Sequence, residues 1–367
     1  MPGPVRHIIG CMTGTSLDAL DAAIVRVEGA GLSMRAAFIR GLSRPLGGLS
    51  PALRRLADQE PVPTGEIARL SREFSVLHAE AVRELAAAAG VRPDLLAVHG
   101  QTIFHAPPVS WQLFNPAPLA EAIRTPVVLD LRAADLARGG QGAPITPIAD
   151  WILFADDHEP RAIVNLGGFC NITILPAGPR DPCRLAGIEG FDVCAGNHLL
   201  DAVARVVLRS DYDVNGAAAL AGEVLAEPLE DLVGILRSQA GSRRSLGTGD
   251  EALEWVSRYR AHAAPNDLAA TACEALGQVI AHRTLGVQRV LLAGGGAKNA
   301  ALVRAISGWA SARVERTDDF AVPIEFREAV SIAVLGALCE DRVPITLPRV
   351  TGVSDPAPVS GVWAFPP

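Results

Sequence analysis

Three glycine-containing segments of the chain have the residue types that bind phosphate groups. They are Gly14-Thr15-Ser16, Gly167-Gly168 and Gly294-Gly295-Gly296, and each follows a short apolar stretch that predicts a strand. Phosphate binding requires several backbone N–H groups at close range, and glycine permits both the close approach and the unusual dihedrals. One such segment is equally typical of a tight hairpin turn, but three of them favour a nucleotide site in a cleft between two domains.

Two carboxylates follow the first of these segments. Asp18 and Asp21 follow Ser16 by two and five residues. A carboxylate beside a polyphosphate is the usual ligand of Mg²⁺ or of its water molecules. The sequence contains neither a Walker A loop nor the glycine fingerprint of dinucleotide-binding folds. A Rossmann dehydrogenase is therefore disfavoured, and the predicted site is a phosphate site of another type.

A third carboxylate could act as a general base. Asp192 lies between Phe191 and a glycine-bearing turn ahead of a predicted helix, where it could remove a proton from an attacking water or hydroxyl group. The same position suits a residue that caps the turn, and the pattern alone leaves both alternatives open. Glu328 begins a late predicted helix, where the helix dipole favours an acidic residue whatever its function.

A polar loop in the first half has the composition of a sugar-binding segment. It carries imidazole, amide and aromatic side chains at His99, Gln101, His105, Trp111, Gln112 and Asn115. Two histidines without a cysteine or carboxylate at ligand spacing favour hydrogen bonding over metal binding. Amide and imidazole groups beside an aromatic platform suit the hydroxyl groups and rings of sugars.

The apolar pattern predicts the elements that position these groups. Two strand, turn, strand units are predicted, the first at residues 5–12 and 22–27 and the second at residues 162–165 and 171–175. They lie about 150 residues apart, which is a typical domain length, and this spacing indicates a duplicated architecture. A long helix with one apolar face runs from Ile67 to Leu85 and ends at Gly90. Further short strands at residues 95–98, 127–131 and 290–293 end beside polar groups, where α/β proteins place ligand contacts.

Length and composition limit the class of protein. A chain of 367 residues exceeds the usual size of one hydrophobic core, so two domains are expected. The apolar residues form no run long enough to span a membrane, and the N-terminus lacks the pattern of a signal peptide, so a cytoplasmic location is expected. The six cysteines form no CxxC pair, which favours reduced thiols, and a net charge of -7 without a basic run disfavours nucleic-acid binding.

The motifs resemble those of one known family, the anhydro-N-acetylmuramic acid kinases. The segment from Gly10 to Asp21 is similar to the N-terminal signature of that family. Further blocks match in order over nearly the whole chain, at residues 99–105, 111–116, 130–132, 139–144, 165–168, 190–192, 294–299, 327–329 and 350–352. So many ordered blocks make the resemblance specific.

The resemblance implies an α/β fold with two duplicated ribonuclease-H-like (actin-like ATPase) domains around an interdomain nucleotide cleft. The N-terminal domain is expected at residues 1–130 plus the C-terminal tail 345–367, and the C-terminal domain at residues 131–344. The implied activity uses ATP and Mg²⁺ to phosphorylate O6 of 1,6-anhydro-N-acetylmuramic acid while water opens the anhydro bridge. The product is N-acetylmuramic acid 6-phosphate, an intermediate of cell-wall recycling.

The family motifs also assign roles to residues. Asp192 occupies the position of the residue that activates the water, and Asp18 is expected to bind Mg²⁺ directly or through water. The expected nucleotide contacts are Gly14, Thr15, Ser16, Leu17, Asp18, Asp21, Gly167, Gly168, Gly294, Gly295, Gly296 and Asn299. The expected sugar contacts are His99, Gln101, Trp111, Asn115, Arg132 and Glu328. The expected partner is a small sugar, with no nucleic acid and no membrane, and a homodimer is one alternative for the oligomeric state.

Departures from the family pattern leave other interpretations open. The stretch from Val193 to Asn197 replaces the family's Thr-Gly-Pro-Gly-Asn, so a catalytically idle homologue is one alternative. Ala19 replaces a glycine beside the phosphate loop. Phe114 replaces a glycine near the expected sugar pocket, and a narrower pocket would suit a smaller anhydro sugar such as levoglucosan. A non-kinase actin-like ATPase is a further alternative, which the polar loop disfavours.

Overall fold

The computed structural model describes residues 4–241 and 250–367, which form two compact α/β units. The first unit comprises Met1–Asp157, Gly178–Glu189 and Ala321–Pro367, and the second comprises His158–Ala177 and Gly190–Phe320. The predicted boundary between the N-terminal and C-terminal domains, at residue 130, lies inside the first of these compact units. The division of the chain into two functional domains at that residue stays a prediction. Each unit is described below by itself.

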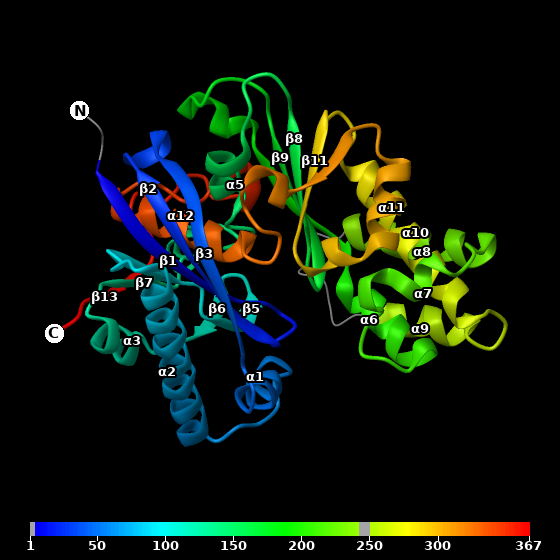
Figure 1. Ribbon diagram of the computed structural model, residues 1–367, viewed down its shortest axis with the longest axis horizontal. Helices are drawn as coiled ribbons and strands as arrows, with labels where there is room; N and C mark the ends of the chain where they lie inside the picture. Colours follow the sequence, from blue (N-terminus) through cyan, green and yellow to red (C-terminus); the bar gives the residue numbers. More distant parts are fainter. Residues whose placement is uncertain (1–3, 242–249) are drawn as a thin grey trace. The chain divides into compact units, whose positions relative to one another are not determined.

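The first unit is built on a six-stranded sheet (Figure 1). In spatial order its strands are β13 (Val362–Ala364), β7 (Val127–Leu129), β4 (Leu95–Val98), β1 (Val5–Thr13), β2 (Ala19–Glu28) and β3 (Arg35–Pro45). The strands β1, β2 and β3 are antiparallel neighbours, whereas β1, β4 and β7 run parallel. Strand β13 is antiparallel to β7, so the end of the chain packs on this sheet.

Helices α2 (Thr64–Ala89) and α12 (Arg327–Glu340) pack on opposite faces of this sheet. Since successive residues of a strand point to opposite sides, neighbouring residues of β1 contact different helices. Ile9 and Cys11 of β1 belong to the same core cluster as Phe74 of α2. Gly10, between them, faces α12, where a Cβ atom would lie 1.9 Å from the backbone oxygen of Ala329. The backbones of β1 and α12 therefore touch, and only glycine fits at position 10.

The remaining elements of the first unit are short helices and one hairpin. Strands β5 (Gln101–Ala106) and β6 (Val109–Leu113) form a separate two-stranded antiparallel sheet. The helices are α1 (Leu49–Ala57), α3 (Pro116–Ile123), α4 (Ala133–Ala137), α5 (Pro147–Phe154), α13 (Pro348–Thr351) and the 3-10 turns η1 (Gly31–Ser33) and η2 (Pro182–Gly187).

The second unit is built on a five-stranded sheet, of which Figure 1 labels β8, β9 and β11. Its sheet contains, in spatial order, β10 (Glu189–Ala195), β9 (Phe169–Leu175), β8 (Arg161–Leu166), β11 (Arg289–Ala293) and β12 (Arg313–Arg316). Strand β8 is antiparallel to β9 and parallel to β11, which is parallel to β12. With the strands of each sheet numbered along the chain, the spatial order in both units is third, second, first, fourth, fifth, and in the first unit β13 is added as a sixth at the edge. This is the ribonuclease-H-like topology. The predicted duplication of this fold is confirmed.

Helices of the second unit follow β10 and β11. They are α6 (Asn197–Val203), which continues as a π-helical turn η3 (Ala204–Leu208), then the turn η4 (Val214–Gly216), α7 (Ala217–Leu220), α8 (Ala226–Gly241), α9 (Asp250–Tyr259), α10 (Pro265–Arg283), the turn η5 (Gly295–Lys298), α11 (Ala300–Trp309) and the turn η6 (Thr317–Phe320). Over residues 4–241 and 250–367, no helix combines the length and hydropathy needed to cross a membrane.

The structure differs from the predictions at three places. Residues 101–106, expected in a loop, form strand β5, in which Gln101 and Ile103 are buried and Phe104 is exposed. Asp192 lies within strand β10 rather than at the turn ahead of α6, whose N-cap is Gly196. Strand β3 was not predicted, because as an edge strand it carries no run of buried residues.

Candidate functional site

The segment from Gly14 to Asp18 forms the turn between β1 and β2. The N–H group of Leu17 donates to the backbone oxygen of Gly14 at 3.2 Å, and Leu17 has a φ of 58° and a buried side chain that anchors the turn in the core. Thr15, Ser16 and Asp18 are exposed. The predicted phosphate loop therefore presents two hydroxyl groups and one carboxylate on a turn held by a buried leucine.

A neutral histidine holds an arginine at the ends of strands β4 and β7. Two guanidinium nitrogens of Arg132, Nε and Nη2, lie 3.2 Å and 2.9 Å from Nε2 of His99. Nδ1 of His99 bonds to the backbone oxygen of Gly100 at 3.0 Å, so Nδ1 carries the proton and Nε2 accepts from Arg132. Burial, and then the charge of Arg132, lower the pKa of His99 from 6.5 to about 3.

Three further polar residues lie beside this pair. In the amide orientation that satisfies both of its ends, Gln112 accepts from Nε of Arg132 at 2.8 Å and donates to Oδ1 of Asp130 at 3.3 Å. Burial raises the pKa of Asp130. His105 bonds to the hydroxyl group of Ser110 at 3.0 Å, and its pKa is lowered by burial and then by the charge of Arg132. The structure thus brings together His99 and Arg132, two of the expected sugar contacts, with Gln112, Asp130 and His105 beside them.

Other predicted sugar contacts lie on elements next to this group. Gln101 begins β5 and is buried, and its Oε1 atom makes no hydrogen bond within the part of the chain that the structure describes. Trp111 is 45% exposed and lies opposite Phe104 in the hairpin, where its ring is accessible as a platform. Asn115 caps helix α3, since its side chain accepts from the N–H group of Ala117 at 3.2 Å.

The expected narrowing of the pocket by Phe114 is not supported. The ring of Phe114 makes edge contacts with Phe74 and His78 of α2, at centroid distances of 6.1 Å and 4.8 Å. Both partners are almost fully buried in the core of the first unit. The larger side chain therefore fills core volume, because a phenyl ring gains more from burial among apolar groups than from exposure.

Glu328 lies in the first turn of α12 directly after a buried ion pair. Arg327 of α12 donates to both carboxylate oxygens of Asp150 of α5, with Nε 2.9 Å from Oδ1, and both residues are at most 1% exposed. Nη2 of Arg327 also donates to the hydroxyl oxygen of Thr146 at 3.3 Å. The half-buried Glu328 thus follows a residue that is fixed on two sides.

In the second unit, the predicted glycine loops converge with the start of α6. The backbone oxygens of Gly167 and Gly168 accept N–H bonds from Asn197 and Gly196 at 2.9 Å and 2.8 Å. A Cβ atom on Gly294 would lie 2.8 Å from the backbone oxygen of Leu166, and one on Gly296 would lie 2.7 Å from Oδ1 of Asn197. Three backbone segments therefore meet where glycine alone leaves room.

Asn299 and Asp192 occupy separate elements of the second unit. Asn299 caps α11, since its Oδ1 atom accepts from the N–H group of Leu302 at 3.0 Å, and a Cβ atom on Gly216 would lie 2.1 Å from that oxygen. Asp192 is exposed on β10. The pKa of the Cys170 thiol on β9 is raised by burial first, then by Cys194, and then by the negative charge of Asp192, so Asp192 lies near Cys170. The described residues contain no group of three or more His, Cys, Asp or Glu side chains arranged to hold a metal ion.

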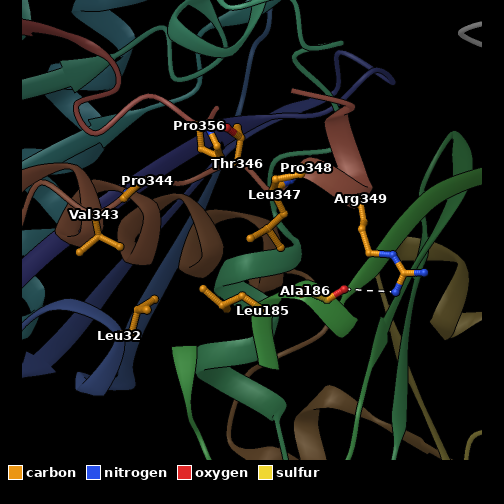
Figure 2. Close-up of a pocket in the computed structure, with 10 residues that line it drawn as sticks. All are labelled: Leu32, Leu185, Ala186, Val343, Pro344, Thr346, Leu347, Pro348, Arg349 and Pro356. Carbon is orange, nitrogen blue, oxygen red and sulfur yellow. Dashed lines mark hydrogen bonds between the residues drawn. The ribbon is translucent and has the colours of Figure 1, made fainter. Parts of the chain in front are cut away.

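The first unit also contains an apolar cavity of about 290 Å³ (Figure 2). It is lined by Leu32 of η1, Leu185 and Ala186 of η2, residues 343, 344 and 346–349, and Pro356. Arg349 at its edge donates to the backbone oxygen of Ala186 at 3.2 Å. None of the predicted site residues lines this cavity, so it is separate from the polar group around Arg132.

The comparison with known families identifies the chain's relatives. The sequence model of the family described as anhydro-N-acetylmuramic acid kinase matches residues 6–364. The chain belongs to this family.

Relatives of the anhydro-N-acetylmuramic acid kinase family match over most of their length. A protein of that name from Bordetella pertussis is 36% identical over 365 residues, which cover 95% of this chain and 93% of the relative. One from Salinibacter ruber is 32% identical over 388 residues, covering 97% and 96%. Among solved structures, an activator of 2-hydroxyisocaproyl-CoA dehydratase from Clostridium difficile is 14% identical, with a TM-score of 0.46 over 90% of this chain and 94% of that one.

The segment from Val193 to Asn197, which departs from the family pattern, ends in a turn held by backbone bonds. Val193, Cys194 and Ala195 complete strand β10 and are buried. Gly196 and Asn197, which the family pattern shares, donate to Gly168 and Gly167, and Nδ2 of Asn197 donates to the backbone oxygen of Leu166 at 3.2 Å. The glycine and asparagine therefore form the turn, and the three preceding positions serve as strand and core.

The buried neutral His99 should make stability depend on pH. The pKa of His99 is about 3 in the folded protein, against 6.5 for an unperturbed imidazole. As pH falls from above 6.5 towards 3, the unfolded chain therefore binds a proton at His99 that the folded protein does not bind. The free energy of unfolding decreases over this pH range. Between pH 7.5 and pH 5, His99 should account for a loss of roughly 2 kcal/mol. His99→Gln cannot titrate, so urea unfolding should show a smaller loss for this variant by about that amount. An equal loss in both proteins would contradict the neutral assignment.

Proposed function

We propose that the protein is an ATP-dependent kinase that opens 1,6-anhydro-N-acetylmuramic acid with water and phosphorylates O6. The product is N-acetylmuramic acid 6-phosphate, which serves cell-wall recycling. The observation that carries this proposal is the family match over residues 6–364, supported by relatives of that name at 36% and 32% identity. Because the match covers almost the full length of these relatives, the proposal extends to the whole activity.

In this proposal both units contribute to phosphate binding. In the second unit we assign it to Gly167, Gly168 and residues 294–296, with Asn299 as a further nucleotide contact. Support comes from the close contacts of Gly294 and Gly296, where a Cβ atom would collide, and from the backbone bonds of Gly167 and Gly168 to the start of α6. In the first unit we assign it to residues 14–17 and Asp21. A turn with accessible N–H and hydroxyl groups suits phosphate oxygens.

Asp18 is the residue that we propose for Mg²⁺. Its carboxylate is exposed directly after the phosphate turn, and Mg²⁺ in kinases is commonly held by one or two carboxylates, phosphate oxygens and water. A single exposed carboxylate therefore fits the ion. When bound, Mg²⁺ would neutralise negative charge on the phosphoryl group that is transferred.

The sugar contacts are assigned to the polar group of the first unit. Gln101 brings a buried Oε1 atom that can accept a hydrogen bond from a sugar hydroxyl or amide group, which would remove the cost of leaving it without a partner. Arg132, oriented by neutral His99, supplies donors, and Trp111 supplies an exposed aromatic surface. Asn115 and Glu328 complete the assignment.

Asp192 is the proposed general base. Its carboxylate would accept a proton from the water that attacks the anomeric carbon. As the bond between this carbon and O6 breaks, O6 takes the γ-phosphoryl group, and ADP leaves. The exposure of Asp192 on β10 supports this assignment, because an exposed carboxylate is accessible to water and to substrate.

The alternatives have less support. A smaller anhydro sugar was favoured by the bulk of Phe114, but this side chain packs on His78 and Phe74 in the core. An idle homologue was favoured by the altered turn, which keeps the bonds of Gly196 and Asn197. The cytoplasmic location and the homodimer stay predictions.

An assay with a panel of sugars tests the proposed function. ADP release should rise in proportion to added 1,6-anhydro-N-acetylmuramic acid, and less with levoglucosan or with N-acetylmuramic acid itself. Greater turnover with levoglucosan would favour the smaller substrate. ADP release that no sugar changes would favour a non-kinase ATPase.

Asp192→Asn tests the assignment of the base. The variant should keep ATP binding, because the assigned nucleotide contacts lie on other segments, and should lose turnover by about a hundredfold or more, as expected for a missing general base. The measurements are kcat with saturating sugar and ATP affinity by calorimetry. Turnover within a few-fold of the unchanged protein would remove Asp192 from the role.

A further inference from the structure

One buried carboxylate holds the loop of residues 139–142 in the first unit. Asp135 of α4 is 1% exposed. Its Oδ2 atom accepts the N–H group of Gly142 at 2.7 Å, and its Oδ1 atom accepts the hydroxyl group of Thr351 at 2.8 Å. A Cβ atom on Gly140 would lie 2.1 Å from Oδ2, so glycine is required for this approach. The carboxylate therefore packs directly on the backbone of the loop.

A second bond ties the same loop to helix α13. The N–H group of Gln141 donates to the backbone oxygen of Thr351 at 2.8 Å, and Thr351 is fully buried. Asp135 and Thr351 thus fix two successive N–H groups, those of Gln141 and Gly142. Two segments more than two hundred residues apart in the sequence are thereby joined by hydrogen bonds.

The opposite side of the loop bonds to the polar group of the proposed sugar site. The backbone oxygen of Gly142 accepts from Nη1 of Arg132 at 2.8 Å, while Arg132 also bonds to His99. The backbone of Gln141 bonds to the imidazole of His105. A continuous series of hydrogen bonds therefore runs from Thr351 through Asp135 and Gly142 to Arg132.

We propose that Asp135 is a positioning residue for sugar binding, which acts by fixing the carbonyl group of Gly142 on which Arg132 is oriented. This inference rests on the proposed function, because it assigns Arg132 to the sugar. Without the carboxylate, the N–H group of Gly142 loses a buried acceptor and the loop relaxes. Arg132 then loses one of its orienting contacts, and a small displacement of a positioning group is costly for catalysis.

A set of variants tests the proposal in the full-length protein. Asp135→Ala should lower kcat/KM for the anhydro sugar by about ten- to a hundredfold, with KM for ATP unchanged. Asp135→Asn should rescue most of this loss, since its amide oxygen can accept from Gly142 and its amide nitrogen can donate to Thr351. Thr351→Val removes one of the two side-chain bonds and should give a smaller loss that is again selective for sugar.

A matched control distinguishes positioning from general stability. Asp341 is a carboxylate of the same unit that also accepts a backbone N–H group, that of Gly31 at 2.7 Å, and it bonds to Arg6. Asp341→Ala should lower the melting temperature without changing KM for the sugar. If Asp135→Ala and Asp341→Ala have the same kinetic effect, the proposal is wrong.

A double-mutant cycle tests whether Asp135 acts through Arg132. If it does, Asp135→Ala should add little to the loss of kcat/KM already caused by Arg132→Met, whereas independent residues would give additive losses. Additive losses would overturn the proposal. Should Asp135→Ala fail to fold, the cycle is made with Thr351→Val, for which the same two outcomes apply.

Amide hydrogen exchange separates this inference from the proposed function. The N–H group of Gly142 should be protected in the unchanged protein and should exchange at least tenfold faster in Asp135→Ala and Asp135→Leu. Unchanged exchange would refute the positioning role even for an active kinase. A third outcome is that no sugar is phosphorylated while the N–H group of Gly142 exchanges faster in the Asp135 variants. Asp135 then holds the loop as described, but the proposed kinase function is wrong, and so is the role of Asp135 in sugar binding.

Discussion

Backbone segments in direct contact, with no side chain between them, determine the construction of both units. In the first unit Gly10 lets the backbone of α12 lie against β1, since a Cβ atom would be 1.9 Å from the oxygen of Ala329. In the second unit Gly294 lies against the backbone of Leu166 in the same way. Because each contact fixes a helix or a loop against the central strand of a ribonuclease-H-like sheet, it also fixes the turn that follows the strand. The phosphate-binding turns of the proposed kinase depend on these contacts, and any larger side chain would require backbone movement.

The first unit adds a second constraint, which is the satisfaction of buried polar groups. His99 stays neutral and accepts from Arg132, Asp135 accepts from Gly142 and Thr351, and Arg327 pairs with Asp150 in the core. Removing one partner of such a pair leaves the other buried without compensation, which is costly. These bonds therefore hold polar side chains in defined orientations beside the assigned sugar contacts. A site that recognises a polar sugar needs this kind of preorganisation more than it needs additional contacts.

Much of the fold could be predicted from sequence, because glycine-rich turns after apolar strands and a helix ending at Gly90 reflect local physical rules. The duplicated topology was accessible through the two strand, turn, strand units, and the strand ends pointed to His99 and Arg132 separately but not to the bonds between them. Other features depend on tertiary contacts. Strand β3 lies at a sheet edge and has no run of buried residues, and the direction of Phe114 into the core follows from the position of α2. The role of Asp135 joins residues more than two hundred positions apart, which no local pattern shows.

The central claim is that the anhydro bridge is opened by water while the sugar takes the phosphoryl group. The most direct test is a reaction in water enriched in oxygen-18, stopped early and analysed by mass spectrometry. The claim predicts one heavy oxygen on the anomeric carbon of the sugar phosphate and none in its phosphoryl group. Heavy oxygen in free phosphate, with the anhydro sugar unchanged, would contradict the claim and indicate simple hydrolysis of ATP.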